Sequence, residues 1–231
     1  MTGEQMPYSM ASDEAVTVFL LLSFFLISYA VGRGRKHIQQ HLKMLFLGKD
    51  RASFFDEPTG SETRYVAALT MVTSLLVGIC LFGYMRQQCQ GTVEPLRGGL
   101  LLSAYSAAVL VYLLVKSGFY SLVNWVFFEK EQRTSWARTF FDVCGFSSFV
   151  LFPIVLLAVY HGINHIIVEW ICALFLVFVK ILLFYKCVKN FFKHFGSWFH
   201  LILYFCTLEI VPLFLLSEAV GAMNSILVIK I

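Results

Sequence analysis

The sequence predicts an all-α, polytopic membrane protein with six transmembrane helices in one bundle. Hydrophobic residues make up 58% of its 231 residues and charged residues 14%, and its mean hydropathy is +0.75. Soluble proteins typically carry about 25% charged residues, so this chain has too little polar material to cover a water-facing surface. Its 24 Phe, 10 Tyr and 4 Trp add the aromatic bulk expected of lipid-facing helices with interfacial aromatic belts.

Six apolar segments predict the transmembrane helices, because each is close to the roughly 20 residues that a helix needs to cross a bilayer. The first segment is expected to remain in the protein rather than to be cleaved as a signal peptide, since Glu4, Asp13 and Glu14 precede or begin it and no Lys or Arg does. The six segments cover residues 14–32, 65–85, 99–127, 140–160, 164–185 and 196–217.

The basic residues predict how the chain is oriented. Lys and Arg number seven in residues 33–64, three in 128–139 and three in 186–195. The alternate side carries three, Arg86, Arg97 and Lys230. Because basic residues accumulate on the cytoplasmic side, the bias of thirteen against three places the basic connections in the cytoplasm and both termini outside.

The connection 33–64 is expected to hold a basic amphipathic helix. Its stretch "RGRKHIQQHLKMLFLGKDRASFF" mixes apolar and basic residues, which is typical of a helix lying on an anionic inner-leaflet surface. Docking of a cytoplasmic partner is the alternative. The following "DEPTGSE" (56–62) is expected to be a loop, because Pro, Gly and Ser cluster there.

These patterns divide the chain into three parts. Residues 1–13 form an outer N-terminal tail, and residues 14–64 hold the first span with its cytoplasmic amphipathic segment. Residues 65–231 form a five-span helical bundle with a short C-terminal tail.

Three charged residues, Lys116, Lys180 and Glu209, lie well inside the predicted spans. Each costs about 2.5–3.5 kcal/mol at the bilayer centre unless it finds a partner. With a rise of about 1.5 Å per residue, Lys116 and Glu209 both lie about 20 Å from the cytoplasmic ends of their helices. We therefore expect Lys116 to pair with Glu209, whereas Lys180 is near enough to the inner interface to extend its ammonium there.

Further polar residues extend this pair towards the cytoplasmic side. Tyr120 and Asn124 follow Lys116 at i+4 and i+8, so the three form one stripe on the third span. His200 and Tyr204 have the same spacing on the sixth span. The candidate intramembrane site consists of Lys116, Tyr120, Asn124, Lys180, His200, Tyr204 and Glu209.

Two interpretations of this site remain open. In the first, the ion pair and the hydrogen bonds of Tyr, Asn and His hold the helices together. In the second, the site binds an ion, a proton or an anionic ligand. Two lysines against one glutamate leave a surplus positive charge, which favours an anion over a metal cation.

Two prolines predict irregular helices. Pro212 cannot donate a hydrogen bond to the carbonyl four residues before it, so the sixth span should loosen or kink beside the glutamate. Pro153 predicts a second irregularity in the fourth span, where Gly145, Ser147 and Ser148 favour close helix packing.

The sequence predicts no metal site, no cofactor and no nucleic-acid partner. The six cysteines include no CxxC pair, which favours apolar filling over disulfides or zinc. "HIQQH" (His37, His41) and "HGINH" (His161, His165) have the i, i+4 spacing of helical metal ligands, but neither has a nearby cysteine or a well-placed carboxylate. The net charge of +4 follows from the basic connections, and the motifs GxSxG, HExxH, GxxxxGK[ST] and GxGxxG are absent from the sequence.

Four stretches of the second half have the character of a known family: "FYSLVNWVFFEKEQRTSW" (119–136), "LFPIVLLAVY" (151–160), "KILLFYKCVKNFFK" (180–193) and "FHLILYFCTLEIVPLFLL" (199–216). Across roughly residues 99–217, the chain resembles the uncharacterised inner-membrane proteins of the Bacteroidota that form domain-of-unknown-function family 4271. The resemblance implies a polytopic protein of the bacterial inner membrane and brings no established activity. The most particular likeness lies in His200, Tyr204, Cys206, Thr207, Leu208, Glu209 and Pro212.

Three functions are compatible with these patterns. The favoured one is a non-enzymatic accessory or scaffold component of an envelope assembly, because catalytic motifs are absent and the connections are short. The second is a small transporter of an anion or a proton-coupled solute that uses Lys116, Lys180 and Glu209. The third is a membrane enzyme acting on a lipid phosphate, with Lys116, Lys180 and His200 facing the phosphate.

Overall fold

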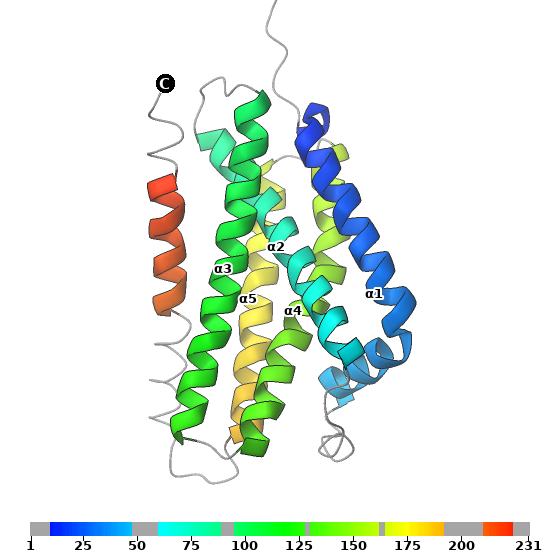
Figure 1. Cartoon of the computed structure of the whole chain (residues 1–231). Coiled ribbons are helices and arrows are strands. Elements are labelled where there is room, and N and C mark those ends of the chain that lie inside the picture. Colours follow the sequence, from blue (N-terminus) through cyan, green and yellow to red (C-terminus); the bar gives the residue numbers. More distant parts are fainter. Residues whose placement is uncertain are drawn as a thin grey trace, which may run out of the picture.

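The chain folds as a bundle of α-helices, shown as a computed structural model in Figure 1. The structure describes residues 10–47, 60–88, 95–127, 130–161, 165–191 and 210–223, and these ranges contain no β-strand. A 3₁₀ turn, η1 (Met10–Ser12), precedes five long helices, α1 (Glu14–Leu47), α2 (Gly60–Gln88), α3 (Pro95–Phe127), α4 (Lys130–Tyr160) and α5 (His165–Phe191). A shorter apolar helix, Ile210–Met223, is called the C-terminal helix below.

Successive long helices run in opposite directions (Figure 1). We call the end where α1, α3 and α5 finish and α2 and α4 begin the basic end. Among the described residues, four helices are long and apolar enough to cross a membrane, which confirms the predicted class of a helical protein with several membrane-span-like helices. The apolar stretches are Glu14–Arg33, Arg64–Arg86, Gly98–Leu122 and Thr139–Tyr160, and they match the first four predicted segments.

Asp13 begins α1 and also ties it to α2. Its Oδ1 accepts the backbone N–H of Ala15 at 3.2 Å, and its carbonyl accepts that of Thr17 at 3.2 Å, which is the geometry of an N-cap. Its Oδ2 accepts a hydrogen bond from Arg86 at 3.2 Å, in an ion pair whose side chains are 9% and 14% exposed. This ion pair joins the start of α1 to the end of α2, away from the basic end.

α2 is the central helix and contacts α1, α3 and α4. A Cβ added at Gly78 would lie 2.9 Å from the Cα of Ser106 on α3, so only glycine permits this approach of the two backbones. Thr73 donates its hydroxyl to the carbonyl of Cys144 on α4 at 2.9 Å. Small residues and interhelical hydrogen bonds of this kind hold helices together in lipid, where the hydrophobic effect does not drive them together.

The small residues of α4 lie in the packed interior, and Gly145 approaches α2. A Cβ added at Gly145 would lie 2.9 Å from a methyl group of Leu69 on α2. Ser147 and Ser148 are buried and donate their hydroxyls to carbonyls of their own helix. Pro153 lies inside α4, which continues through it to Tyr160 at the cost of one backbone hydrogen bond.

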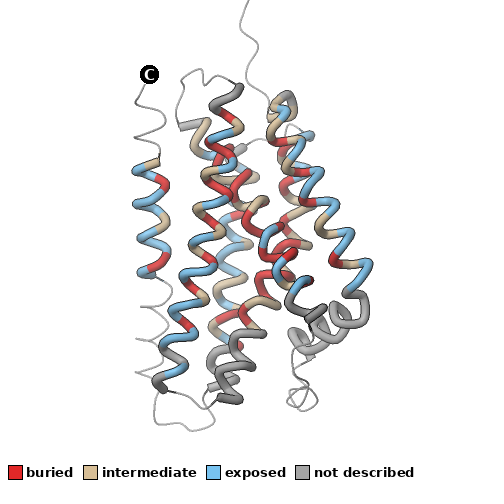
Figure 2. Tube along the Cα trace, viewed as in Figure 1, coloured by how far each residue is buried: buried red, intermediate tan, exposed pale blue. Residues whose placement is uncertain are grey.

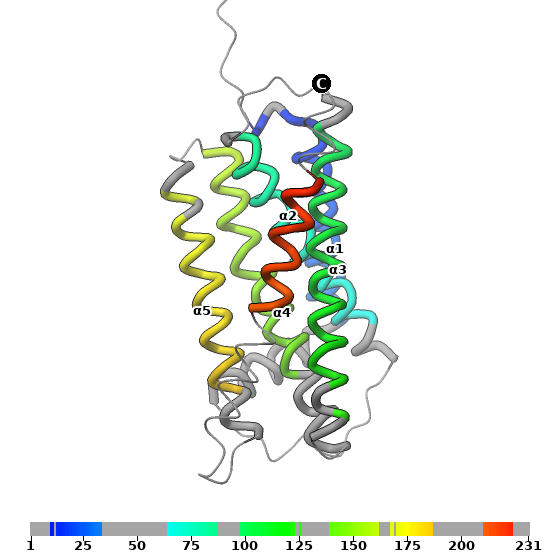
Figure 3. The backbone as a smooth tube through the Cα atoms, turned by 90° about the vertical axis from the view of Figure 1, so that its left-hand side faces the viewer, coloured from blue at the N-terminus to red at the C-terminus, as the bar shows by residue number. Residues whose placement is uncertain are grey.

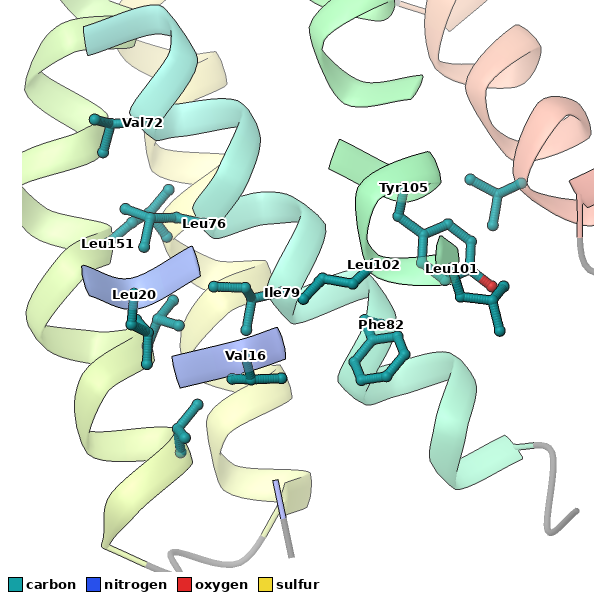
Figure 4. Close-up of a cluster of buried hydrophobic side chains, with 13 residues drawn as sticks. Val16, Leu20, Val72, Leu76, Ile79, Phe82, Leu101, Leu102, Tyr105 and Leu151 are labelled. Carbon is teal, nitrogen blue, oxygen red and sulfur yellow. The ribbon is translucent and has the colours of Figure 1, made fainter. Parts of the chain in front are cut away.

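Two large buried clusters and a small one, made of Ala30, Tyr65 and Leu69, fill the described part of the bundle. The larger one joins α1, α2, α3, α4 and the C-terminal helix in the half away from the basic end (Figure 4). Its members are Val16, Leu20, Val72, Leu76, Ile79, Phe82, Leu101, Leu102, Tyr105, Leu151, Val155, Val159 and Val220. The second cluster joins α3, α4 and α5 nearer the basic end and consists of Val109, Leu113, Tyr120, Phe140, Val143, Cys144 and Leu183.

The outward surface of the bundle is largely apolar. Figure 2 shows exposed positions along the outer faces of α1, α3 and α5. Phe25 of α1 is 65% exposed, and Trp170 and Leu174 of α5 are 72% and 73% exposed. An apolar surface of this extent suits lipid rather than water.

The C-terminal helix lies beside α3, as Figures 1 and 3 both show. Its Val220 belongs to the same buried cluster as Leu101 and Tyr105 of α3. Pro212 is buried at the start of this helix. The kink predicted there involves residues before 210, which lie outside the described residues.

The first helix extends beyond the first span. α1 runs from Glu14 to Leu47 and its membrane-length stretch ends at Arg33, so residues 34–47 are helical and directly joined to that stretch. Whether this part lies on the membrane surface, as the sequence predicts, stays a prediction. Figure 1 shows α1 turning sideways at its lower end. No Pro interrupts this stretch, and residues 48–59 lie outside the described residues.

Three predicted loops are shorter than expected. α4 begins at Lys130 and α5 ends at Phe191, so most of residues 128–139 and much of 186–195 are helical. α2 begins at Gly60, inside the stretch predicted as a loop. Hydropathy marks only the part of a helix that crosses lipid, whereas backbone hydrogen bonding continues into water where the sequence, as in "KEQRTSWAR", has neither Gly nor Pro.

Candidate functional site

Lys116 lies inside the bundle on α3, with only 2% of its surface exposed. Its Nζ lies 5.6 Å from the ring centroid of Phe140 on α4. The ring centroids of Tyr120 and Tyr112, one turn either side on α3, lie at 5.8 and 5.9 Å. Aromatic rings within about 6 Å stabilise an ammonium by about 2 kcal/mol where water is excluded. The aromatic surface therefore offsets much of the roughly 2.5–3.5 kcal/mol that a lysine costs at the centre of a membrane.

Lys180 of α5 reaches the same group of side chains. It is half-buried, and its Nζ donates a hydrogen bond to the hydroxyl of Tyr112 at 3.3 Å. Lys116 and Lys180 each lie 11 residues before the end of their helices, at Phe127 and Phe191. This places both about 16 Å from the basic end. The ammonium of Lys180 thus turns towards Tyr112 rather than towards the end of its helix.

We call Lys116, Tyr112, Tyr120, Phe140 and Lys180 the Lys116 cluster. Tyr112 is its centre, because its ring faces one lysine and its hydroxyl accepts a hydrogen bond from the other. The cluster links α3 to α4 through Phe140 and α3 to α5 through Lys180. Tyr120 and Phe140 also contact each other, with ring centroids 5.6 Å apart.

Three of the seven residues of the predicted site belong to this cluster, namely Lys116, Tyr120 and Lys180. Asn124 lies on α3 one turn beyond Tyr120, but its side chain is outside the described part of the chain. His200, Tyr204 and Glu209 also lie outside the described residues. The predicted ion pair between Lys116 and Glu209 therefore stays a prediction.

Sequence reasoning missed two members of the cluster. Tyr112 precedes Lys116 by four residues and so extends the predicted stripe by one turn. That spacing could have identified it. Phe140 had no comparable signal, because its approach depends on how α4 crosses α3.

Lysines outnumber acidic residues among the charged side chains that the structure describes within these helices. Within Gly98–Leu122, Thr139–Tyr160 and residues 167–186, the described charged side chains are Lys116, Lys180, Lys186 and Asp142. Lys186 is 9% exposed and Asp142 is partly buried. Three lysines against one aspartate suit a negatively charged partner better than a metal cation.

The described residues contain no group of three or more His, Cys, Asp or Glu that could hold a metal ion. His161 lies at the bend after α4, and its N–H donates to the carbonyl of Leu157 at 2.9 Å. His165 is the first residue of α5, so the two histidines of "HGINH" lie on different elements. His37 and His41 lie on α1, and their side chains are not among those described.

Comparison with protein families identifies the relatives of this chain. Residues 16–220 match the family described as Domain of unknown function (DUF4271), so the chain belongs to this family. The match confirms the family resemblance and extends it from the second half to the first spans. No curated protein and no solved structure matches the chain.

Proposed function

We propose that this member of the DUF4271 family is a six-span protein of the bacterial inner membrane, with both termini outside, that serves as a non-enzymatic component of an envelope assembly. The described α1–α4 supply four membrane-length stretches. α5, with 27 residues and a largely exposed apolar surface, and the C-terminal helix would supply the other two. The thirteen basic residues of the three connections favour the orientation.

The single observation that carries the non-enzymatic role is the enclosure of Lys116. An ammonium that is 2% exposed and faced by three aromatic rings is already engaged by the protein itself. The Lys116 cluster connects three helices at one depth, which is what a structural fastening requires. A reaction centre would instead need an open face towards its substrate.

The proposed partners lie at the basic end. There the chain carries most of its Lys and Arg, which attract anionic headgroups of the inner leaflet by about 1 kcal/mol per residue near the surface. A protein component of the assembly would dock beside these headgroups.

The test of this role is purification of the tagged chain at its native abundance from mildly solubilised membranes. We expect a protein partner in fixed stoichiometry, recovered again when the partner carries the tag, with crosslinks to lysines of the basic end. A similarly tagged polytopic inner-membrane protein is the control. A chain that elutes alone, and that by itself moves a solute or turns over a lipid in vesicles, would contradict the role.

A second candidate is the transport of an anion or a proton-coupled solute. The surplus of lysine around Lys116 and Lys180 is the observation in its favour. Under this candidate, inorganic phosphate should raise the unfolding temperature of the purified protein more than chloride at equal ionic strength. Lys180→Met should abolish the difference, whereas Arg33→Met, which removes an exposed cation of α1, should preserve it. An equal effect of both anions would reject this candidate.

A further inference from the structure

Two cysteines from distant parts of the chain meet in the half of the bundle away from the basic end. The Sγ atoms of Cys80 on α2 and Cys172 on α5 lie 3.8 Å apart, across a sequence separation of 92 residues. Neither forms a disulfide in this structure. Cys172 is 9% exposed, and Cys80 is partly buried at the edge of the larger cluster.

The two cysteines lie at matching depth. Cys80 precedes Gln88, the last residue of α2, by eight residues, and Cys172 follows His165, the first residue of α5, by seven. These separations place the two thiols about 12 and 10 Å from the ends of their helices. Both distances are measured from the end that also carries the Asp13–Arg86 ion pair.

We propose that Cys80 and Cys172 form a reversible disulfide that fastens α5 to the central helix α2. A disulfide requires sulfurs about 2.05 Å apart, so the two sulfurs must approach by about 1.8 Å. Rotation of both side chains about Cα–Cβ moves the sulfurs on this scale. The fastening matters because α5 packs chiefly on α4 and makes fewer contacts with α2.

The oxidation needs a two-electron acceptor that reaches the apolar layer, and a membrane quinone has this chemistry. The two thiols lose two protons and two electrons, the S–S bond forms, and the quinone takes up both protons and both electrons as quinol. A disulfide at this depth persists where the adjoining compartment is oxidising, as the extracytoplasmic side of bacteria is. This part rests on the orientation proposed above.

The test uses a chain in which Cys89, Cys187 and Cys206 are replaced by Ser, leaving Cys80, Cys144 and Cys172. Membranes are treated with a short-chain ubiquinone or with copper(II)–phenanthroline, and free thiols are counted by alkylation in denaturant. We expect three thiols to fall to one without any dimer on a non-reducing gel. Dithiothreitol should restore all three.

Three variants identify the pair. In the same background, Cys80→Ser or Cys172→Ser should leave two thiols after oxidation. In Cys144→Ser, which removes a buried cysteine of α4, the number of free thiols per chain should fall from two to none on oxidation. A peptide map of the oxidised parent, showing the fragments of α2 and α5 joined, gives the same answer without any variant of the pair. Three thiols that survive both oxidants, or disulfides that join two chains, would overturn the proposal.

The redox state in cells completes the test. Cells are quenched in acid and alkylated at once, and the Cys80–Cys172 pair should be recovered only after reduction. A pair that oxidises in isolated membranes but stays fully reduced in cells would overturn the proposal as well. Neither result bears on the partner purification, so failure of the disulfide and failure of the scaffold role can be told apart.

Discussion

Tyr112 contacts two lysines with different parts of its side chain, and two substitutions separate these parts. Tyr112→Phe removes the hydroxyl that accepts the 3.3 Å hydrogen bond from Lys180, and it keeps the ring 5.9 Å from Lys116. Hydrogen bonds to charged groups contribute about 1.5–3 kcal/mol. Because Lys180 is half-buried and the bond is long, we expect Tyr112→Phe to lower the free energy of unfolding by about 1 kcal/mol.

Tyr112→Leu should cost more, because it also removes the ring. The lost cation–π contact with Lys116 adds about 1 kcal/mol, and the smaller side chain leaves unfilled space that adds a similar amount. The expected total is about 2–3 kcal/mol. The difference between the two substitutions therefore measures what the ring contributes to holding Lys116.

The assay is the unfolding of purified protein in detergent, combined with a double-mutant cycle between Tyr112→Phe and Lys180→Met. The coupling energy should be about 1 kcal/mol, since Tyr112→Phe has no hydrogen bond left to remove in the Lys180→Met background. Tyr185→Phe, at a 59% exposed tyrosine of α5, is the matched control and should change nothing. Separate contributions of the ring and the hydroxyl of Tyr112 are excluded if Tyr112→Phe costs as much as Tyr112→Leu, or if its cost is unchanged in the Lys180→Met background.

Three further substitutions test the packing of the bundle by the same unfolding assay. Gly78→Ala should lower the free energy of unfolding by about 1–3 kcal/mol, because its Cβ meets the α3 backbone. Gly118→Ala is the control and should be neutral or stabilise, since nothing lies within 4 Å of its Cβ. Equal effects of the two substitutions would exclude the close approach of α2 and α3. Asp13→Asn should keep the N-cap and lose the ion pair with Arg86. Asp13→Ala should lower the free energy of unfolding by about 1 kcal/mol more, because the cap is lost too. Identical losses for the two variants would show that the cap contributes nothing. Thr73→Val should cost about 0.6 kcal/mol, the average for an interhelical hydrogen bond in a membrane protein, and a stabilised variant would contradict that bond.

The sequence predicts the helices where apolar content alone decides the outcome. The starts of the first four membrane stretches agree within one residue, because lipid requires an unbroken apolar helix of fixed length. The helices extend beyond the predicted spans where that requirement stops. α4 extends ten residues before Phe140 and α1 continues past Arg33, because backbone hydrogen bonding needs no apolar side chains.

The candidate site divides in the same way. Lys116 and Tyr120 share a stripe that helical spacing predicts. The sequence predicts a Lys180 nearer the inner interface, because it does not show that α5 continues to Phe191, 11 residues beyond this lysine. The same spacing also predicts that Tyr112 lies beside Lys116. It does not predict the contact with Phe140, because that contact depends on the crossing of two helices.

The meeting of Cys80 and Cys172 has the same origin. It requires α5 to lie against α2, which no local pattern encodes. The sequence alone predicts which residues share one face of a helix. Which helices contact each other is decided only when all of them pack together.

The most direct test of the central claim compares abundance with function for Lys116. A strain lacking the gene receives Lys116→Met, Glu209→Gln or both, and membrane levels are measured beside rescue of the phenotype. If Lys116 pairs with Glu209 as the sequence predicts, a structural fastening means that each single substitution lowers the level, because it would leave one charge without its partner at a cost of about 3–5 kcal/mol. The double substitution should then restore both level and rescue. Variants present at normal levels that fail to rescue would contradict this account and make Lys116 part of a working site.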